Sequence, residues 1–257
     1  MTSDTPKQPQ HPPSDHSPEA IIERLSAGPN QIYLKDFIYG AIDGGITTFA
    51  VVSGVSGAGL SSGIIIILGI ANLLADGFSM GISNFLGTRA ENQHRERIRE
   101  EEHQEILSHP DGEREEIRQI YARKGFSGEL LEKAVNVITA DREQWVDTMM
   151  QEEHGISLLP VNAVKAGLIT FVAFILIGVI PLLTFLINWV TPGAIAQPFL
   201  WSSILTLISF FIVGVTKGHY ITHSWLRAGL ETLIIGTIAA ALAYGIGYAL
   251  QGLIETT

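Results

Sequence analysis

Two apolar stretches in close succession decide the fold, FIYGAIDGGITTFAVVSGVSGA over 37–58 and GIIIILGIANLLADGFSMGISNFLG over 63–87. Each has almost no charged side chains and exceeds the length of about 18 residues that an apolar helix needs to cross a bilayer. Only the short segment 59–62 joins them. We therefore expect a tight antiparallel hairpin of two transmembrane helices.

Three more stretches of this kind follow, at about 166–189, 199–215 and 229–250. The sequence thus predicts an all-α, polytopic membrane protein with five transmembrane helices, surrounded by lipid. The predicted organisation is a disordered cytoplasmic tail over 1–30, transmembrane helices 1–2 over 31–88, a cytoplasmic helical insert over 89–160, and transmembrane helices 3–5 over 161–257.

The basic residues predict the orientation of these helices. All 16 Lys and Arg residues fall in the tail, near the cytoplasmic ends of spans, in the insert, or in the 217–227 loop. Five spans place these segments on one side, which the positive-inside rule assigns to the cytoplasm. The N-terminus and insert are therefore expected in the cytoplasm. The short loops favour a bacterial inner membrane over a vacuolar membrane.

Composition excludes several classes of function. The chain has no cysteine, which excludes disulfides and thiolate metal sites. Its net charge of −10 opposes nucleic acid binding and is compatible with cations as partners.

Polar side chains inside the first two spans are candidate functional groups, because ionisable residues are costly in a bilayer. We expect Asp43 and Met80 to meet at one depth, since the helices are antiparallel. A carboxylate with a thioether suits a borderline divalent ion better than Mg²⁺ or Ca²⁺. The predicted transport path comprises Asp36, Asp43, Asn72, Asp76 and Met80. The last three recur at a spacing of four residues and form a stripe along the second span, which Asn84 extends.

Structural roles are the alternatives for this stripe. Asp36 would then cap the first helix, Met80 would pack, and Asn72 would hydrogen bond to a neighbouring helix. The glycines of the first span favour close helix contacts, with contacts between protomers preferred, or keep the helix thin beside a path.

The insert is expected to form three helices, 89–108, 112–124 and 128–155, with a break near 139–141 left open. Two carboxylates precede the first turn of the insert and two follow it, at positions symmetric about His109. Each pair has i, i+3 spacing and lies on one helix face, so a helical hairpin would bring the two pairs together. Four facing carboxylates repel unless they are protonated or bridged by cations. These carboxylates are Glu102, Glu105, Glu113 and Glu116.

Met149 and Met150 precede Glu153 by four and three residues and add a mixed oxygen and sulfur face. The predicted metal site of the insert therefore comprises the four carboxylates with Met149, Met150 and Glu153. The alternative is a solvated helix pair with many salt bridges. Further candidate ligands are His94, His103, His109 and His154.

The stretch from Asp43 to Ala58, then Ser79-Met80-Gly81 and the acidic insert, resembles the vacuolar iron transporter family. The resemblance implies a homodimer with a translocation path between its two copies. It implies export of Fe²⁺, and often of Mn²⁺ too, from the cytoplasm in exchange for protons. Zn²⁺ is a further candidate metal for this chain. The resemblance also assigns Asp43 and Met80 to the membrane ion site, and the insert residues to a metal site ahead of the pore.

The chain departs from the family's plant and parasite members at two places. It has Gln31 and Ile32 where they place a Glu before the first span, and Asn72 where they place one in the second. Asp76, one turn further on, is the candidate replacement for the second carboxylate.

Two rival functions remain open at this stage. One is a membrane-anchored metal store or sensor that does not transport. The other is a carboxylate ferroxidase, for which Glu91-x-x-His94 and Glu100-x-x-His103 have the spacing of di-iron bundles. Both motifs lie on one predicted helix, which argues against such a bundle, and we expect no enzymatic activity.

Overall fold

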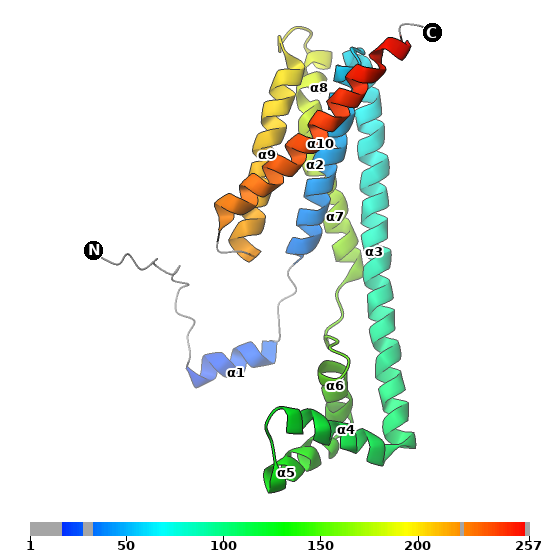
Figure 1. Ribbon diagram of the computed structural model, residues 1–257, viewed down its shortest axis with the longest axis vertical. Helices are drawn as coiled ribbons and strands as arrows, with labels where there is room; N and C mark the ends of the chain where they lie inside the picture. Colours follow the sequence, from blue (N-terminus) through cyan, green and yellow to red (C-terminus); the bar gives the residue numbers. More distant parts are fainter. Residues whose placement is uncertain (1–16, 28–32, 222–223, 255–257) are drawn as a thin grey trace, which may run out of the picture. The chain divides into compact units, whose positions relative to one another are not determined.

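The computed structural model describes residues 17–27, 33–221 and 224–254, and every regular element in these ranges is a helix (Figure 1). The chain divides into two units, Met1–Ile32 and Tyr33–Thr257. The first contains helix α1, Pro18–Ala27. The second contains all the other helices.

Helix α1 lies in the segment that the sequence predicts to be a disordered tail. Its start has a local cause, because the Ser17 hydroxyl accepts a hydrogen bond from the Ala20 backbone N–H at 3.3 Å. Pro18 occupies the first helical position, where its fixed φ is favourable. Residues 1–16 and 28–32, which include Gln31 and Ile32, lie outside the described residues.

Five helical segments are long and apolar enough to cross a membrane, so the predicted number of spans is confirmed for the described residues. The protein is therefore an all-helical, multi-pass membrane protein. The segments are α2 (Leu34–Gly57), the first half of α3 (Ser62–Ser108), the α7–α8 segment (Ala163–Val190), α9 (Pro198–Ile221) and α10 (Trp225–Ile254).

Helix α3 is one continuous element of 47 residues, whereas the sequence suggested a span followed by a separate insert helix. The backbone hydrogen bonds of the helix continue without interruption from Gly87 to Arg89, and the residues that follow are good helix formers. In Figure 1 this helix runs from α2 and α7 to the helices of the insert. It therefore connects the membrane part directly to the insert.

The third span is divided. Helix α7 (Ala163–Gly178) is followed by a 3₁₀ turn, η1 (Ile180–Leu182), and by α8 (Leu183–Val190). Pro181 stands in the 3₁₀ turn, and a proline cannot donate the backbone hydrogen bond that a continuous α-helix requires.

Helix α2 is the centre of the membrane part and contacts α3, α7, α9 and α10. Its glycines permit this, because a Cβ at Gly40 would lie 2.2 Å from the Thr170 carbonyl oxygen and one at Gly44 would lie 2.3 Å from that of Phe174. Gly57 meets Tyr244 of α10 in the same way. The close contacts expected of the first span are therefore made within the chain at these positions, against α7 and α10.

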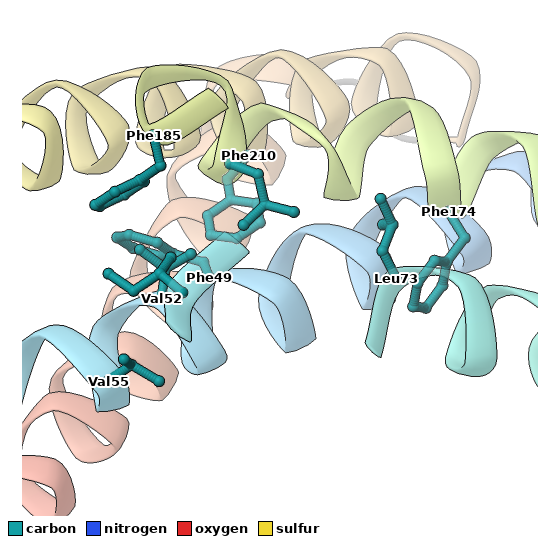
Figure 2. Close-up of a cluster of buried hydrophobic side chains, with 9 residues drawn as sticks. Phe49, Val52, Val55, Leu73, Phe174, Phe185 and Phe210 are labelled. Atoms are coloured by element: carbon teal, nitrogen blue, oxygen red, sulfur yellow. The ribbon is translucent and has the colours of Figure 1, made fainter. Parts of the chain in front are cut away.

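Apolar side chains from six elements fill the space around α2 (Figure 2). Burying them together is compatible with a bilayer because van der Waals packing, more than the hydrophobic effect, drives helix association there. The cluster comprises Phe49, Val52, Val55, Ile65, Leu73, Phe174, Leu182, Phe185 and Phe210.

The insert contains the C-terminal half of α3, then α4 (Pro110–Arg123), α5 (Gly128–Thr139) and α6 (Arg142–Glu152). The third predicted helix, 128–155, is thus two helices. Asp141 causes the division, because its side chain accepts hydrogen bonds from the backbone N–H groups of Glu143 and Gln144 and caps α6. The insert has its own apolar core, which includes Ile106, Ile117, Val135, Trp145 and Val146.

Candidate metal centres

A polar stripe follows one face of α3 in the membrane part. Asn72, Asp76, Met80 and Asn84 recur at intervals of four residues, and all four are half-buried. A parallel line of buried small residues on the adjacent face, including Gly77 and Gly81, packs against α7. The close packing of this second line holds the polar stripe at a fixed distance from its neighbours.

Asp76 of α3 and Asp43 of α2 form the central pair of this region. Both are half-buried, and their carboxylates are near enough to interact electrostatically. Two neighbouring carboxylates on adjacent membrane helices repel unless a proton or a cation is bound. The sequence identified both residues but paired Asp43 with Met80.

Asp43 also lines an open groove of about 350 Å³ with Lys35, Tyr39 and Lys217. Lys217 belongs to α9 and forms an ion pair with Glu231 of α10, with 3.7 Å between the charged atoms. Lys217 was expected in a loop at 217–227 and is not among the predicted path residues, because its distance along the chain from Asp43 gives no sign of their proximity.

Asp36 is tied to two other helices. The Asn84 side-chain amide donates to Asp36 Oδ1 at 2.8 Å and to Thr170 Oγ1 at 2.7 Å. The Thr170 hydroxyl in turn lies 3.3 Å from the Asp36 carbonyl oxygen. Tyr33, not Asp36, occupies the N-cap position of α2, so the capping role considered for Asp36 is wrong. Thr170 is a further residue that the sequence did not single out.

Asn72 and Met80 have contrasting surroundings. Asn72 Nδ2 is buried and has no hydrogen-bond partner among the described residues, which is an unfavourable state for an amide in an apolar environment. The simple helix–helix hydrogen bond considered for Asn72 is therefore absent at that nitrogen. Met80 packs against the apolar cluster around α2. Its role as an ion ligand remains a prediction.

The insert brings its acidic residues together as the hairpin geometry predicts. Glu102, Glu105 and Glu113 each place one carboxylate oxygen within 4.8 Å of the others. Glu116 lies near enough to Glu102, Glu105 and Glu153 to interact with them electrostatically. All five carboxylates therefore form one cluster, contributed by α3, α4 and the end of α6.

Two of these carboxylates are buried. Glu102 is 2% exposed and Glu113 is 5% exposed. The Oε2 atom of each carboxylate has no hydrogen-bond partner among the described residues. A buried, unpartnered carboxylate oxygen is energetically costly. A divalent cation would satisfy both oxygens, so the residues present fit a metal site.

The electrostatic state of the cluster agrees with this description. Burial, then repulsion from Glu116 and Glu102, raises the pKa of Glu113 to about 7. Burial also raises the pKa of Glu102, although the hydrogen bond with His154 opposes this shift. The pKa of Glu116 is raised by burial and by the nearby Glu153. Glu113 is thus partly protonated near neutral pH when no cation is bound.

Among the four candidate histidines, His154 alone lies in a group that could hold a metal ion. Its Nε2 is 2.6 Å from Glu102 Oε1. His103 is 3.5 Å from Glu143, His109 contacts Ser108, and His94 contacts Arg97. Glu91-x-x-His94 and Glu100-x-x-His103 both lie on α3, as expected, and one helix cannot supply both halves of a di-iron bundle.

Met149 and Met150 are fully buried in the apolar core of the insert. They pack with the cluster that includes Ile106 and Trp145. Their packing role is therefore clear, and a ligand role for either sulfur remains a prediction.

Comparison with known proteins gives consistent matches. Residues 34–248 match the model of the VIT family. The chain is 33% identical over 219 residues to vacuolar iron transporter 1 of Arabidopsis thaliana, which covers 85% of this chain and 86% of that protein. It is 33% identical over 226 residues to the vacuolar iron transporter of Toxoplasma gondii, covering 85% of this chain and 74% of the relative. The match to vacuolar iron transporter 1 of Oryza sativa is 30% over 219 residues, covering 85% of each chain.

Proposed function

Because the chain belongs to the VIT family, we propose that it exports Fe²⁺ from the cytoplasm in exchange for protons, with Mn²⁺ as a second substrate. The names of its relatives support transport of a metal ion. The direction, the exchange for protons and the second metal are inferred from the family resemblance of the sequence and from the expected orientation of the chain.

The pair formed by Asp43 and Asp76 carries the proposal. Neighbouring carboxylates on adjacent membrane helices favour either a bound cation or a bound proton, and the two occupants exclude each other. Arrival of a proton from the far side would therefore weaken metal binding at Asp43 and release the ion. Asp76 supplies the carboxylate that Asn72 cannot.

The insert would capture Fe²⁺ before it enters the membrane. Its carboxylates are Glu102, Glu105, Glu113, Glu116 and Glu153, with Met149 and Met150 as proposed additional ligands. Helix α3 is continuous from this cluster to Asp76, so the two centres share one rigid element. The proposed route then passes Asp36, near the cytoplasmic end of α2.

The proposed setting is a homodimer in a bacterial inner membrane, with the N-terminus and the insert in the cytoplasm. The distribution of Lys and Arg supports this orientation. Copies would meet so that the groove beside Asp43 faces the translocation path.

Uptake of Fe²⁺ into proteoliposomes tests the proposal. Wild type is compared with and without an inward-acidic pH gradient, beside Asp43→Ala, Asp43→Asn and the control Asp111→Asn. Asp111 is exposed in the first turn of α4, so its variant should transport normally. Gradient-stimulated uptake that is lost in both Asp43 variants supports proton exchange through this carboxylate.

Unchanged transport by Asp43→Asn would overturn the proposed role of the carboxylate. Absence of uptake by wild type, with metal still bound to the insert, would favour the alternative function of a membrane-anchored metal store or sensor.

A further inference from the structure

His154 occupies a position that the proposed function leaves unexplained. Its imidazole lies against the buried carboxylate of Glu102, with 2.6 Å between Nε2 and Oε1, and is 3.9 Å from Glu153 Oε2. Its side chain is 29% exposed, so it stands between the cluster and solvent. It is the one nitrogen ligand within reach of these carboxylates in the described part of the insert.

The end of α6 fixes the position of His154. The backbone N–H groups of Glu153 and His154 both donate to the Met149 carbonyl oxygen. Gly155 then has a φ of +64°, and the Ile156 N–H donates to the Met150 carbonyl oxygen at 2.8 Å. These bonds and the left-handed conformation of Gly155 end the helix at this point. His154 is therefore held by a rigid backbone and not by a mobile loop.

The distances suit a single ion. One ligand atom each from Glu102, Glu153 and His154 lies within 4.8 Å of the others. Two ligands at about 2.0–2.2 Å from one metal lie about 3–4.4 Å apart. The Nε2–Oε1 pair at 2.6 Å would therefore have to separate by a few tenths of an ångström, and the more distant ligand atoms would have to approach by a similar amount, for one ion to bind all three residues. Glu102 also has its buried Oε2 without a partner, which would remain available to a second ion near Glu105 and Glu113.

We propose that His154 is a metal ligand, and that Glu102, Glu153 and His154 form a subsite selective for ions that bind imidazole. Imidazole suits Zn²⁺ and Fe²⁺, whereas Mn²⁺, Mg²⁺ and Ca²⁺ prefer oxygen ligands. The insert thus discriminates among divalent ions before they reach the membrane. This inference deepens the proposed function and rests on it for its biological meaning.

Chemical modification of the wild-type protein tests the ligand role of His154 without a variant. Diethyl pyrocarbonate modifies histidine side chains, and mass spectrometry measures the extent of modification at each one. A neutral imidazole has one unprotonated nitrogen, and a metal bound there removes the reactive site. Zn²⁺ should slow modification of His154 by about tenfold or more and leave the exposed His109 unchanged. An unchanged rate of His154 modification with Zn²⁺ would overturn the proposal, since no metal would then be bound to the imidazole. A faster rate would also overturn it, since the imidazole would then be a counterion that Zn²⁺ displaces from the carboxylates.

Calorimetric titration of the full chain with Zn²⁺ and with Mn²⁺ tests the selectivity. His154→Gln should lose about tenfold more affinity for Zn²⁺ than for Mn²⁺. His103→Gln is the matched control, because His103 also faces an acidic residue of the insert, Glu143. Equal losses for the two metals in His154→Gln, or none, would contradict a selective nitrogen ligand. Fe²⁺ uptake into liposomes is a separate readout. If wild-type protein takes up no Fe²⁺ but Zn²⁺ still protects His154 from modification, the proposed function is refuted and the ligand role of His154 stands.

Discussion

The side-chain amide of Asn84 donates a 2.8 Å hydrogen bond to the carboxylate of Asp36, which is 48 residues earlier in the chain. The bond joins α3 to α2, and the same amide reaches Thr170 of α7. Three membrane helices are therefore fixed to one another beside a proposed path residue. One carboxylate oxygen of Asp36 is held, which fixes the direction of the other.

Asn84→Ala should lower both stability and transport. It removes a hydrogen bond to a charged group in a partly buried site, which costs about 1–2 kcal/mol. Thermal unfolding in detergent and Fe²⁺ uptake are the measurements. Ser83→Ala is the control, because Ser83 is the exposed neighbour of Asn84. Equal melting temperatures for the two variants would show that the bond contributes nothing.

Gly44→Ala should destabilise the membrane part by about 1–3 kcal/mol, as overpacking does in other cores. The added Cβ would lie 2.3 Å from the backbone carbonyl oxygen of Phe174, and a helix backbone cannot yield as a side chain can. Gly63→Ala, whose Cβ would meet only the Ser61 hydroxyl at 3.8 Å, should be tolerated. Unfolding in detergent compares the two variants, and similar losses of stability would contradict the expected cost of overpacking between α2 and α7.

The metal-free insert should become less stable as pH rises from about 4.5 to about 7. Glu113 has a folded pKa of about 7 against 4.5 in the unfolded chain, so the folded state binds the proton more tightly. Its contribution is complete below pH 4.5 and is lost as pH rises through 7. The raised pKa values of Glu102, Glu116 and His154 act in the same direction.

Hydrogen exchange of the amides of α4 to α6, corrected for the intrinsic rate at each pH, measures this dependence. Saturating Zn²⁺ should restore the protection lost at neutral pH, because a cation replaces the protons among the carboxylates. Protection that rises with pH in the metal-free protein would contradict the assigned pKa directions.

Glu113→Gln should separate stability from metal binding. At pH 7.5 the variant removes a buried negative charge, so the metal-free insert should become more stable, while its affinity for Zn²⁺ should fall by about tenfold or more. Calorimetry and hydrogen exchange give the two quantities. Glu115→Gln, at an exposed position that pairs with Arg118, should change the Zn²⁺ affinity little. Unchanged Zn²⁺ affinity in Glu113→Gln would exclude Glu113 as a ligand.

The sequence by itself determined the five spans, because an apolar stretch long enough for a bilayer is a local property of the chain. It also determined that Glu102, Glu105, Glu113 and Glu116 would gather, since the turn at His109 and the helical period fix their faces. The polar stripe of α3, which comprises Asn72, Asp76, Met80 and Asn84, followed from spacing in the same way.

Only the tertiary structure decided which groups meet across the helices. Helix rotation and packing set these contacts, and spacing along one helix does not fix them. They include the proximity of Asp43 and Asp76, the position of Lys217 in the groove beside Asp43, and the hydrogen bond between Asn84 and Asp36. His154 stood among four candidate histidines until the end of α6 placed its imidazole against Glu102. Continuity of α3 likewise arises because no residue near Gly87 breaks the helix where it leaves the apolar stretch.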